Sequence, residues 1–305
     1  MKEKIITILG PTSTGKSDLA VDASLNYSGE VISADSRQVY KGLDIGTGKI
    51  IKEEMKNVPH HMLDVADPKE RFTVKQYKEM AERSILDIHK RGLLPVVCGG
   101  TGFYISAIID KIDFPEVPPN KDLRKKYQNK KTEDLFQELK TKDPKRAETI
   151  DPLNRHRLIR SLEIIKHIGS VPEISKKKNT YQNLIIGIDR DSKDLKEKIK
   201  KRLHQRLENG MLEEAVKLNK EGLSFERMEE LGLEYRFMAR YLKGYISKDE
   251  MIRSLENSIW HYVKRQRTWF KKDKRILWFH PDQKKEIYKK VEQFYKDKDT
   301  KKKKG

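Results

Sequence analysis

An octapeptide near the N-terminus, Gly10–Ser17 (GPTSTGKS), follows the apolar run Ile5–Leu9 and opens a helical pattern. Its glycines let the backbone bend so that several amide N–H groups face a polyphosphate. Lys16 adds a positive charge, and the Ser17 hydroxyl can hold Mg²⁺. This strand, loop and helix predict a phosphate-binding loop, without specifying a nucleotide as the ligand. The candidate phosphate-binding residues are Gly10, Pro11, Thr12, Ser13, Thr14, Gly15, Lys16 and Ser17.

Further short apolar runs, bounded by turn or breaker residues, alternate with helical patterns along the chain. They are Val31–Ala34, Leu93–Cys98, Leu184–Ile188 and Ile276–Phe279. Such alternation is typical of a parallel sheet covered by helices. We therefore expect an α/β fold, with a P-loop-type parallel sheet flanked by helices. The chain is mostly helical in pattern from Ser192 to about Lys272, which predicts a helical C-terminal part.

The proline-rich segment Asp113–Pro119 interrupts the alternation and begins a charged, helix-rich stretch that lasts until about Asn183. Prolines break regular elements, so this segment is typical of a boundary. We expect an inserted helical subdomain over residues 116–183, within a catalytic core of residues 1–115 and 184–295. The lysine-rich residues 296–305 are expected to form a disordered basic tail.

The carboxyl ends of the first three predicted strands carry the phosphate loop, Asp35, and the segment Gly99–Gly102 with Thr101. In open α/β sheets these ends meet at one edge, where ligands bind. Asp35 is therefore a candidate catalytic carboxylate; a Mg²⁺ ligand or a helix cap is the alternative. The strand Leu93–Cys98 lacks the terminal acidic residue that NTPases use to hold Mg²⁺. This absence argues against a phosphoryl-transfer function, but that function stays open because Asp35 could hold the Mg²⁺.

The chain carries 66 lysines and arginines against 47 acidic residues, a formal charge of +19. A surface this basic usually meets polyanions, although a generally lysine-rich composition is the alternative. The stretch Trp260–Arg275 interleaves seven basic residues with aromatic ones. It could hold a phosphate backbone and stack on bases, as RNA-binding surfaces do, or it could be a solvated helix face. The expected core-facing stripe of this helix is Ile252, Leu255, Ile259, Tyr262, Gln266, Trp269 and Phe270.

Cys98 is the single cysteine, which excludes an intramolecular disulfide and a cysteine-rich zinc site. This usage fits a reducing, cytoplasmic setting. The first residues lead directly into the phosphate-loop strand, and no apolar stretch approaches the roughly 20 residues that span a bilayer, so we expect no membrane association. The pair His60–His61 lacks a third metal ligand nearby. A monomer is the simplest expectation.

Six blocks of sequence together resemble the tRNA dimethylallyltransferase family in order and spacing, and they span nearly the whole chain. They are GPTSTGKS (10–17), ADSRQVYKGLDIGTGK (34–49), PHHMLDVADPKERFTV (59–74), PVVCGGTGFY (95–104), DPLNRHRLIRSLEI (151–164) and VKRQRTWF (263–270).

The resemblance implies transfer of a dimethylallyl group from dimethylallyl diphosphate to N6 of adenosine 37, next to the tRNA anticodon, with diphosphate leaving. The phosphate loop would then bind the diphosphate with Mg²⁺. By matching position, Asp35 is implied as the base or hydrogen-bond acceptor at the adenine N6, and Thr101 lies beside the reacting centre. The adenine must leave its stack to reach the strand ends, so a flipped base is implied.

Contacts to the tRNA anticodon stem-loop transfer from the same motifs. The implied residues are Asp35, Ser36, Arg37, Gln38, Thr101, Arg124, His156, Arg157, Leu158, Ile159, Arg160, Lys264, Arg265, Gln266, Arg267, Thr268 and Trp269.

The chain departs from the family pattern at several positions. His156, Ser161, Gly48, Ile50, His204, Arg206 and Glu234 replace the usual residues, and Lys198 stands where an arginine is common. Lysine keeps the charge but loses the planar fork, so a diphosphate-clamping role is not carried onto Lys198.

Two other functions remain open from the residues. An ATP-binding kinase or NTPase with a basic surface would show nucleotide-stimulated turnover. A protein that only docks RNA would not depend on Asp35 for any chemistry.

Overall fold

The structure is a computed structural model that describes residues 3–173 and 181–297. It divides into two compact units, the first formed by residues 1–111 and 178–305 and the second by residues 112–177. The second unit begins four residues before the start of the expected insertion, 116–183, and ends six residues before the end of that insertion. Strand β5 starts at Gln182, two residues earlier than the apolar run alone indicates.

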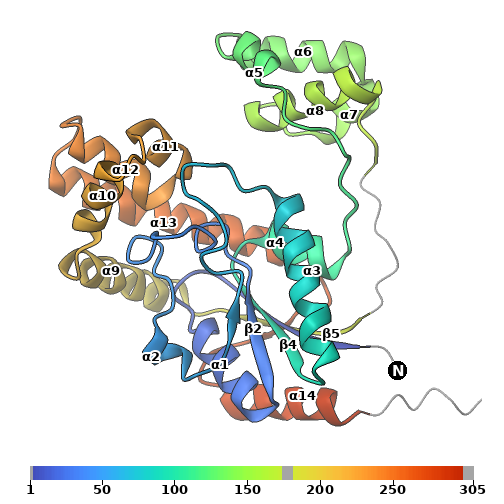
Figure 1. Cartoon of the computed structure of the whole chain (residues 1–305), viewed down its shortest axis with the longest axis vertical. Coiled ribbons are helices and arrows are strands. Elements are labelled where there is room, and N and C mark those ends of the chain that lie inside the picture. Colours follow the sequence, from blue (N-terminus) through green and yellow to red (C-terminus); the bar gives the residue numbers. More distant parts are fainter. Residues whose placement is uncertain (1–2, 174–180, 298–305) are drawn as a thin grey trace, which may run out of the picture. The chain divides into compact units, whose positions relative to one another are not determined.

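A six-stranded parallel sheet forms the centre of the first unit, as the sequence predicted (Figure 1). Its spatial order is β3-β2-β4-β1-β5-β6. The strands are β1 (Lys4–Leu9), β2 (Gly29–Ser33), β3 (His60–His61), β4 (Leu94–Gly99), β5 (Gln182–Ile188) and β6 (Leu277–Phe279). The two-residue strand β3 was not among the predicted strands.

Helices cover both faces of this sheet because alternate residues of each central strand point to opposite sides. In β1, Ile5 and Leu9 join one buried cluster, whereas Ile6 and Ile8 join another. The first unit's helices are α1 (Lys16–Asn26), α2 (Lys52–Met55), α3 (Val74–Lys90), α4 (Gly102–Ile109), α9 (Ser192–Glu208), α10 (Met211–Lys220), α11 (Phe225–Leu231), α12 (Leu233–Leu242), α13 (Lys248–Phe270) and α14 (Lys284–Lys296).

The second unit is helical and has its own core. Its helices are α5 (Lys121–Tyr127), α6 (Thr132–Lys142), α7 (Pro144–Thr149) and α8 (Arg155–Ile168). The side chains of Leu135, Leu139, Leu158 and Leu162 are almost fully buried among them. Asparagine and aspartate side chains cap α5, α7 and α8, which accounts for the polar residues that precede each helix.

The predicted core stripe of α13 is partly wrong. Its buried residues are Met251, Leu255, Ile259, Val263, Gln266 and Phe270. Ile252 and Tyr262 are only half-buried, and Trp269 is 39% exposed. Trp269 instead lies over the start of α4, where its ring contacts Phe103 edge-on at 6.3 Å between centroids. Four of the seven expected residues, Leu255, Ile259, Gln266 and Phe270, are therefore buried, and Met251 and Val263 take the remaining buried positions.

Helix α14 was also not singled out in the sequence, and it packs Ile287 and Val291 against the sheet. Lys4 donates hydrogen bonds to the carbonyls of Phe294, Tyr295 and Asp297 at its C-terminal end. The expected basic tail, 296–305, lies outside the described residues from 298 onward. Within the described ranges, no helix combines the length and apolar character needed to cross a membrane.

Candidate functional site

A cavity of about 150 Å³ lies in the first unit where β1, β2 and β4 end. Its walls come from the phosphate loop, from the segment after β2, from the loop of residues 42–49, and from helices α9 and α13. The cavity lies at the edge of the sheet where the sequence predicts a site. The lining residues include Lys16, Ser17, Asp35, Gly48, Arg202, Arg206, Glu234, Tyr262 and Gln266.

The phosphate loop follows β1 and leads into α1 as expected. Gly10 has a φ of +152°, and a Cβ there would lie 2.1 Å from the carbonyl oxygen of Ile188, so only glycine fits. The Lys16 ammonium donates to the Pro11 carbonyl at 3.0 Å. Burial lowers the pKa of Lys16, and nearby Cys98 and Asp35 oppose that change. The Lys16 side chain thus hydrogen-bonds within its own loop and lines the cavity.

Asp35 lies at the end of β2 and uses one carboxylate oxygen within the protein. Its Oδ1 accepts from the backbone N–H groups of Arg37 at 2.8 Å and Gln38 at 3.4 Å. Within residues 3–173 and 181–297, no protein group donates to Oδ2. Asp35 lines the cavity together with Lys16, so this oxygen is available to a donor on a ligand.

Thr101 is not among the residues that line the cavity. Its hydroxyl oxygen accepts from the Ser36 backbone N–H at 3.0 Å, and it also hydrogen-bonds Tyr262. Burial raises the pKa of Tyr262 to about 12, so the phenol stays protonated at neutral pH. Thr101 thereby connects the β2 end, α4 and α13.

Two arginines on α9 line the opposite wall, and neither was among the candidate residues. Arg202 donates to the Gly48 carbonyl at 2.8 Å, and Arg206 donates to the Gly46 carbonyl at 2.9 Å and pairs with Glu234 at 3.1 Å. Burial lowers the pKa of Arg202, as does neighbouring Arg206. Lys198 does not line the cavity. The two departures Arg206 and Glu234 are therefore partners in one ion pair.

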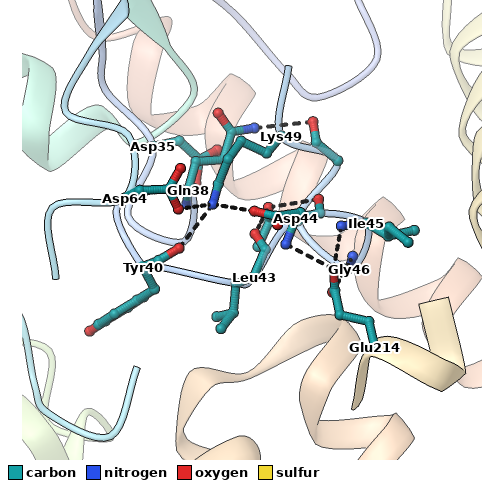
Figure 2. Close-up of polar contacts among 12 residues, drawn as sticks. Asp35, Gln38, Tyr40, Leu43, Asp44, Ile45, Gly46, Lys49, Asp64 and Glu214 are labelled. Atoms are coloured by element: carbon teal, nitrogen blue, oxygen red, sulfur yellow. Dashed lines mark hydrogen bonds and ion pairs between the residues drawn. The ribbon is translucent and has the colours of Figure 1, made fainter. Parts of the chain in front are cut away.

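The 42–49 loop is held by charged side chains on either side (Figure 2). Lys49 donates to the Tyr40 carbonyl at 2.9 Å and pairs with Asp44 at 2.6 Å and Asp64 at 2.5 Å. Its side chain is only 6% exposed. This lysine therefore supports the loop and does not face a ligand.

On α13, the motif-derived residues divide into two groups. Gln266 is 5% exposed, donates to the Gly100 carbonyl at 2.9 Å and accepts from the Thr12 N–H at 3.2 Å. Arg267 binds both oxygens of Asp189 and the Arg190 carbonyl. Both side chains are thus used inside the protein. The residues on solvent are Lys264, Arg265, Thr268 and Trp269.

The second unit shows the same division. Glu163, whose side chain is fully buried, binds Arg124 at 2.6 Å and Arg160 at 3.3 Å. Leu158 is fully buried and Ile159 half-buried in the core of this unit. His156 and Arg157 face solvent. A direct role in binding tRNA does not suit the buried Leu158.

The residues around the phosphate loop suit a divalent cation that shares its coordination with a bound polyphosphate. Mg²⁺ is usually held by one or two protein oxygens together with substrate phosphates and water. The exposed Ser17 hydroxyl on this cavity is a donor of that kind. Elsewhere in the described chain, no group of three His, Cys, Asp or Glu residues could hold a metal, and His60 and His61 hydrogen-bond Val58 and Glu30 instead.

Comparison with known proteins identifies the family. Residues 38–273 match the family model "IPP transferase". The chain is 40% identical to "tRNA dimethylallyltransferase 1" of Geotalea uraniireducens (strain Rf4), over 92% of this chain and 94% of that protein. It superposes on the full-length tRNA isopentenylpyrophosphate transferase of Bacillus halodurans with a TM-score of 0.73 at 36% identity, covering 96% and 97% of the two chains. A eukaryotic dimethylallyltransferase acting on tRNA gives a TM-score of 0.73 at 25% identity, over 88% of this chain and 70% of that one. The chain belongs to the IPP transferase family.

Proposed function

We propose that this enzyme transfers a dimethylallyl group from dimethylallyl diphosphate to N6 of adenosine 37 in tRNA and releases diphosphate. The observation that carries the proposal is the juxtaposition of a phosphate loop, Arg202 and an open Asp35 oxygen on one cavity. Family membership supports the same chemistry, since relatives are tRNA dimethylallyltransferases.

The diphosphate would lie against the phosphate loop, between the cations of Lys16 and Arg202. Backbone N–H groups at the start of α1 suit an anion because the helix N-terminus carries partial positive charge. When bound with the diphosphate, Mg²⁺ supplies charge neutralisation for the leaving group, and Ser17 would hold it. Lys16 and Arg202 would stabilise the negative charge that develops on the leaving oxygen.

Asp35 would act on the nucleophile. The adenine N6 lone pair attacks C1 of the dimethylallyl group while the C1–O bond breaks and its electron pair leaves with diphosphate. The proton lost from N6 passes to the Asp35 carboxylate, whose Oδ2 is open. An exocyclic amine is a weak nucleophile, so a carboxylate that accepts its proton would assist the attack as a general base. A base that has left its stack suits a site at the end of the strands.

The tRNA would bind through exposed basic and polar side chains. Lys264 and Arg265 on α13, and His156 and Arg157 on α8, face solvent. Together with the net charge of +19, they suit a phosphate backbone, and the affinity should fall steeply with salt. We propose action as a monomer in the cytoplasm, where tRNA is modified.

Mass spectrometry of nucleosides tests this function. The enzyme is incubated with Mg²⁺, dimethylallyl diphosphate and an unmodified tRNA that carries adenosines at positions 36 and 37. We expect a five-carbon gain on adenosine 37. No gain with several tRNAs, together with ATP turnover, would support the kinase or NTPase alternative.

The variant Asp35→Asn separates transfer from binding. It should abolish transfer and leave tRNA affinity nearly unchanged, while Asp18→Asn, a matched change at an exposed position of α1, should leave both unchanged. Unchanged transfer by Asp35→Asn would remove Asp35 from the mechanism.

A further inference from the structure

Glu214 on α10 accepts four hydrogen bonds, three from the backbone of the 42–49 loop (Figure 2) and one from the Tyr235 side chain. Its Oε2 accepts from the N–H groups of Asp44 at 3.0 Å and Ile45 at 2.7 Å. Its Oε1 accepts from the Gly46 N–H at 2.9 Å and from the Tyr235 hydroxyl at 2.6 Å. Three consecutive amides thus converge on one carboxylate, as they do around a bound anion.

The carbonyls of the same loop face the cavity arginines. The Gly46 carbonyl accepts from Arg206 at 2.9 Å, and the Gly48 carbonyl accepts from Arg202 at 2.8 Å and from Gln38 at 3.2 Å. Glu214 is not itself a wall of the cavity. It can influence a ligand there through the loop, whose carbonyls accept hydrogen bonds from the arginine side chains.

Close packing makes this connection stiff. A Cβ on Gly46 would lie 2.6 Å from the Tyr235 hydroxyl oxygen, so the loop rests directly against this ring. Burial, followed by the neighbouring Glu214, raises the pKa of Tyr235, which keeps its hydroxyl a donor. Lys49 holds the far end of the loop through Asp44 and Asp64. A change at Glu214 should therefore shift the backbone of the loop as far as Gly48.

We infer that Glu214 is a positioning residue of the diphosphate site: by holding the Asp44–Gly46 amides it sets the Gly48 carbonyl that directs Arg202 toward the bound anion. The identity of the anion rests on the proposed function, whereas the coupling of Glu214 to anion binding does not.

Inorganic pyrophosphate is the probe, because it needs no turnover. Glu214→Gln keeps the side-chain length but replaces one acceptor oxygen by an NH₂ donor that opposes the loop amides. We expect the Kd for pyrophosphate to rise on the order of tenfold, since bonds to a charged group are lost. In the assay with tRNA, KM for dimethylallyl diphosphate should rise similarly while KM for tRNA stays unchanged. The matched control is Glu213→Gln, an exposed neighbour on the same helix, which should leave all these constants unchanged.

These readouts distinguish positioning from folding. A merely structural role would lower the folded fraction and the maximal rate without changing Kd or KM. If Glu214→Gln does not fold, Tyr235→Phe, which removes one of the four donors, should raise the pyrophosphate Kd by about threefold. An unchanged Kd in a folded Glu214→Gln, or in Tyr235→Phe where only that variant folds, would overturn the inference. If no tRNA is modified but pyrophosphate binding still depends on Glu214, the proposed function fails and the inference stands.

Discussion

Replacing Gln266 by leucine should destabilise the protein without directly lowering its affinity for tRNA. Leucine has a similar volume but can neither donate to the Gly100 carbonyl nor accept from the Thr12 N–H. The Gly100 carbonyl is buried and would lose its partner, whereas the half-buried Thr12 N–H can be reached by water. One neutral hydrogen bond contributes about 1 kcal/mol, and an orphaned buried group costs about 1–3 kcal/mol. We therefore expect a loss of about 2–4 kcal/mol in the free energy of unfolding.

Urea unfolding followed by fluorescence measures this loss, and filter binding at fixed salt measures tRNA affinity per folded molecule. Thr268→Ala is the control, because Thr268 is exposed on the same helix, and its stability should change by less than about 0.5 kcal/mol. A stability loss below about 1 kcal/mol for Gln266→Leu, combined with a tenfold drop in tRNA affinity, would refute the structural role argued from its burial.

Three further predictions concern buried polar groups. Hydrogen bonds from Arg91 lower the pKa of Glu30 to about 2, so the contribution of Glu30 to the free energy of unfolding is fully present above pH 4.5 and is lost as the pH falls toward 2. Glu30→Gln should therefore lower the free energy of unfolding at pH 7 by about 2 kcal/mol, measured by urea titration. A deficit that persists unchanged at pH 2 would contradict this. Glu163→Gln leaves Arg124 without its carboxylate partner and should destabilise the second unit by about 3 kcal/mol. Amide hydrogen exchange should then become faster within residues 112–177 only. Equal acceleration in the first unit would argue against this prediction. Burial raises the pKa of the Cys98 thiol to about 12. Ellman's reagent at pH 8 should therefore react with the unfolded protein but hardly with the folded protein. Equal reaction rates would show that the thiol is accessible in the folded state.

The sheet could be predicted from the sequence because its central strands are continuous apolar runs that end at glycines or polar residues. β1 and β4 are buried on both faces, and such strands stand out in any sequence. β3 could not be found in this way. It has two half-buried histidines and is defined only by its pairing with Val31 and Ile32 of β2.

The positions of the phosphate loop and Asp35 could be predicted because local spacing and strand ends determine them. The roles of Arg202, Arg206 and Glu214 depend on contacts between residues more than 150 positions apart. Helix α9 carries many basic residues, and their spacing alone does not tell which two face the cavity. Motif matching likewise grouped buried Gln266 with exposed Lys264, since a motif records which residues recur and not which way each side chain points.

The order of the sheet also determines when the protein can finish folding during synthesis. β1 leaves the ribosome first, but one of its two neighbours, β5, follows only after the more than 80 residues that separate it from β4. At 5–20 residues per second this delay is roughly 4–17 s. During that interval a nascent sheet of β3, β2, β4 and β1 would expose the apolar edge of β1, which makes it a template for unwanted pairing. Slow translation through residues 112–177 would therefore lengthen the period in which the nascent chain depends on chaperones.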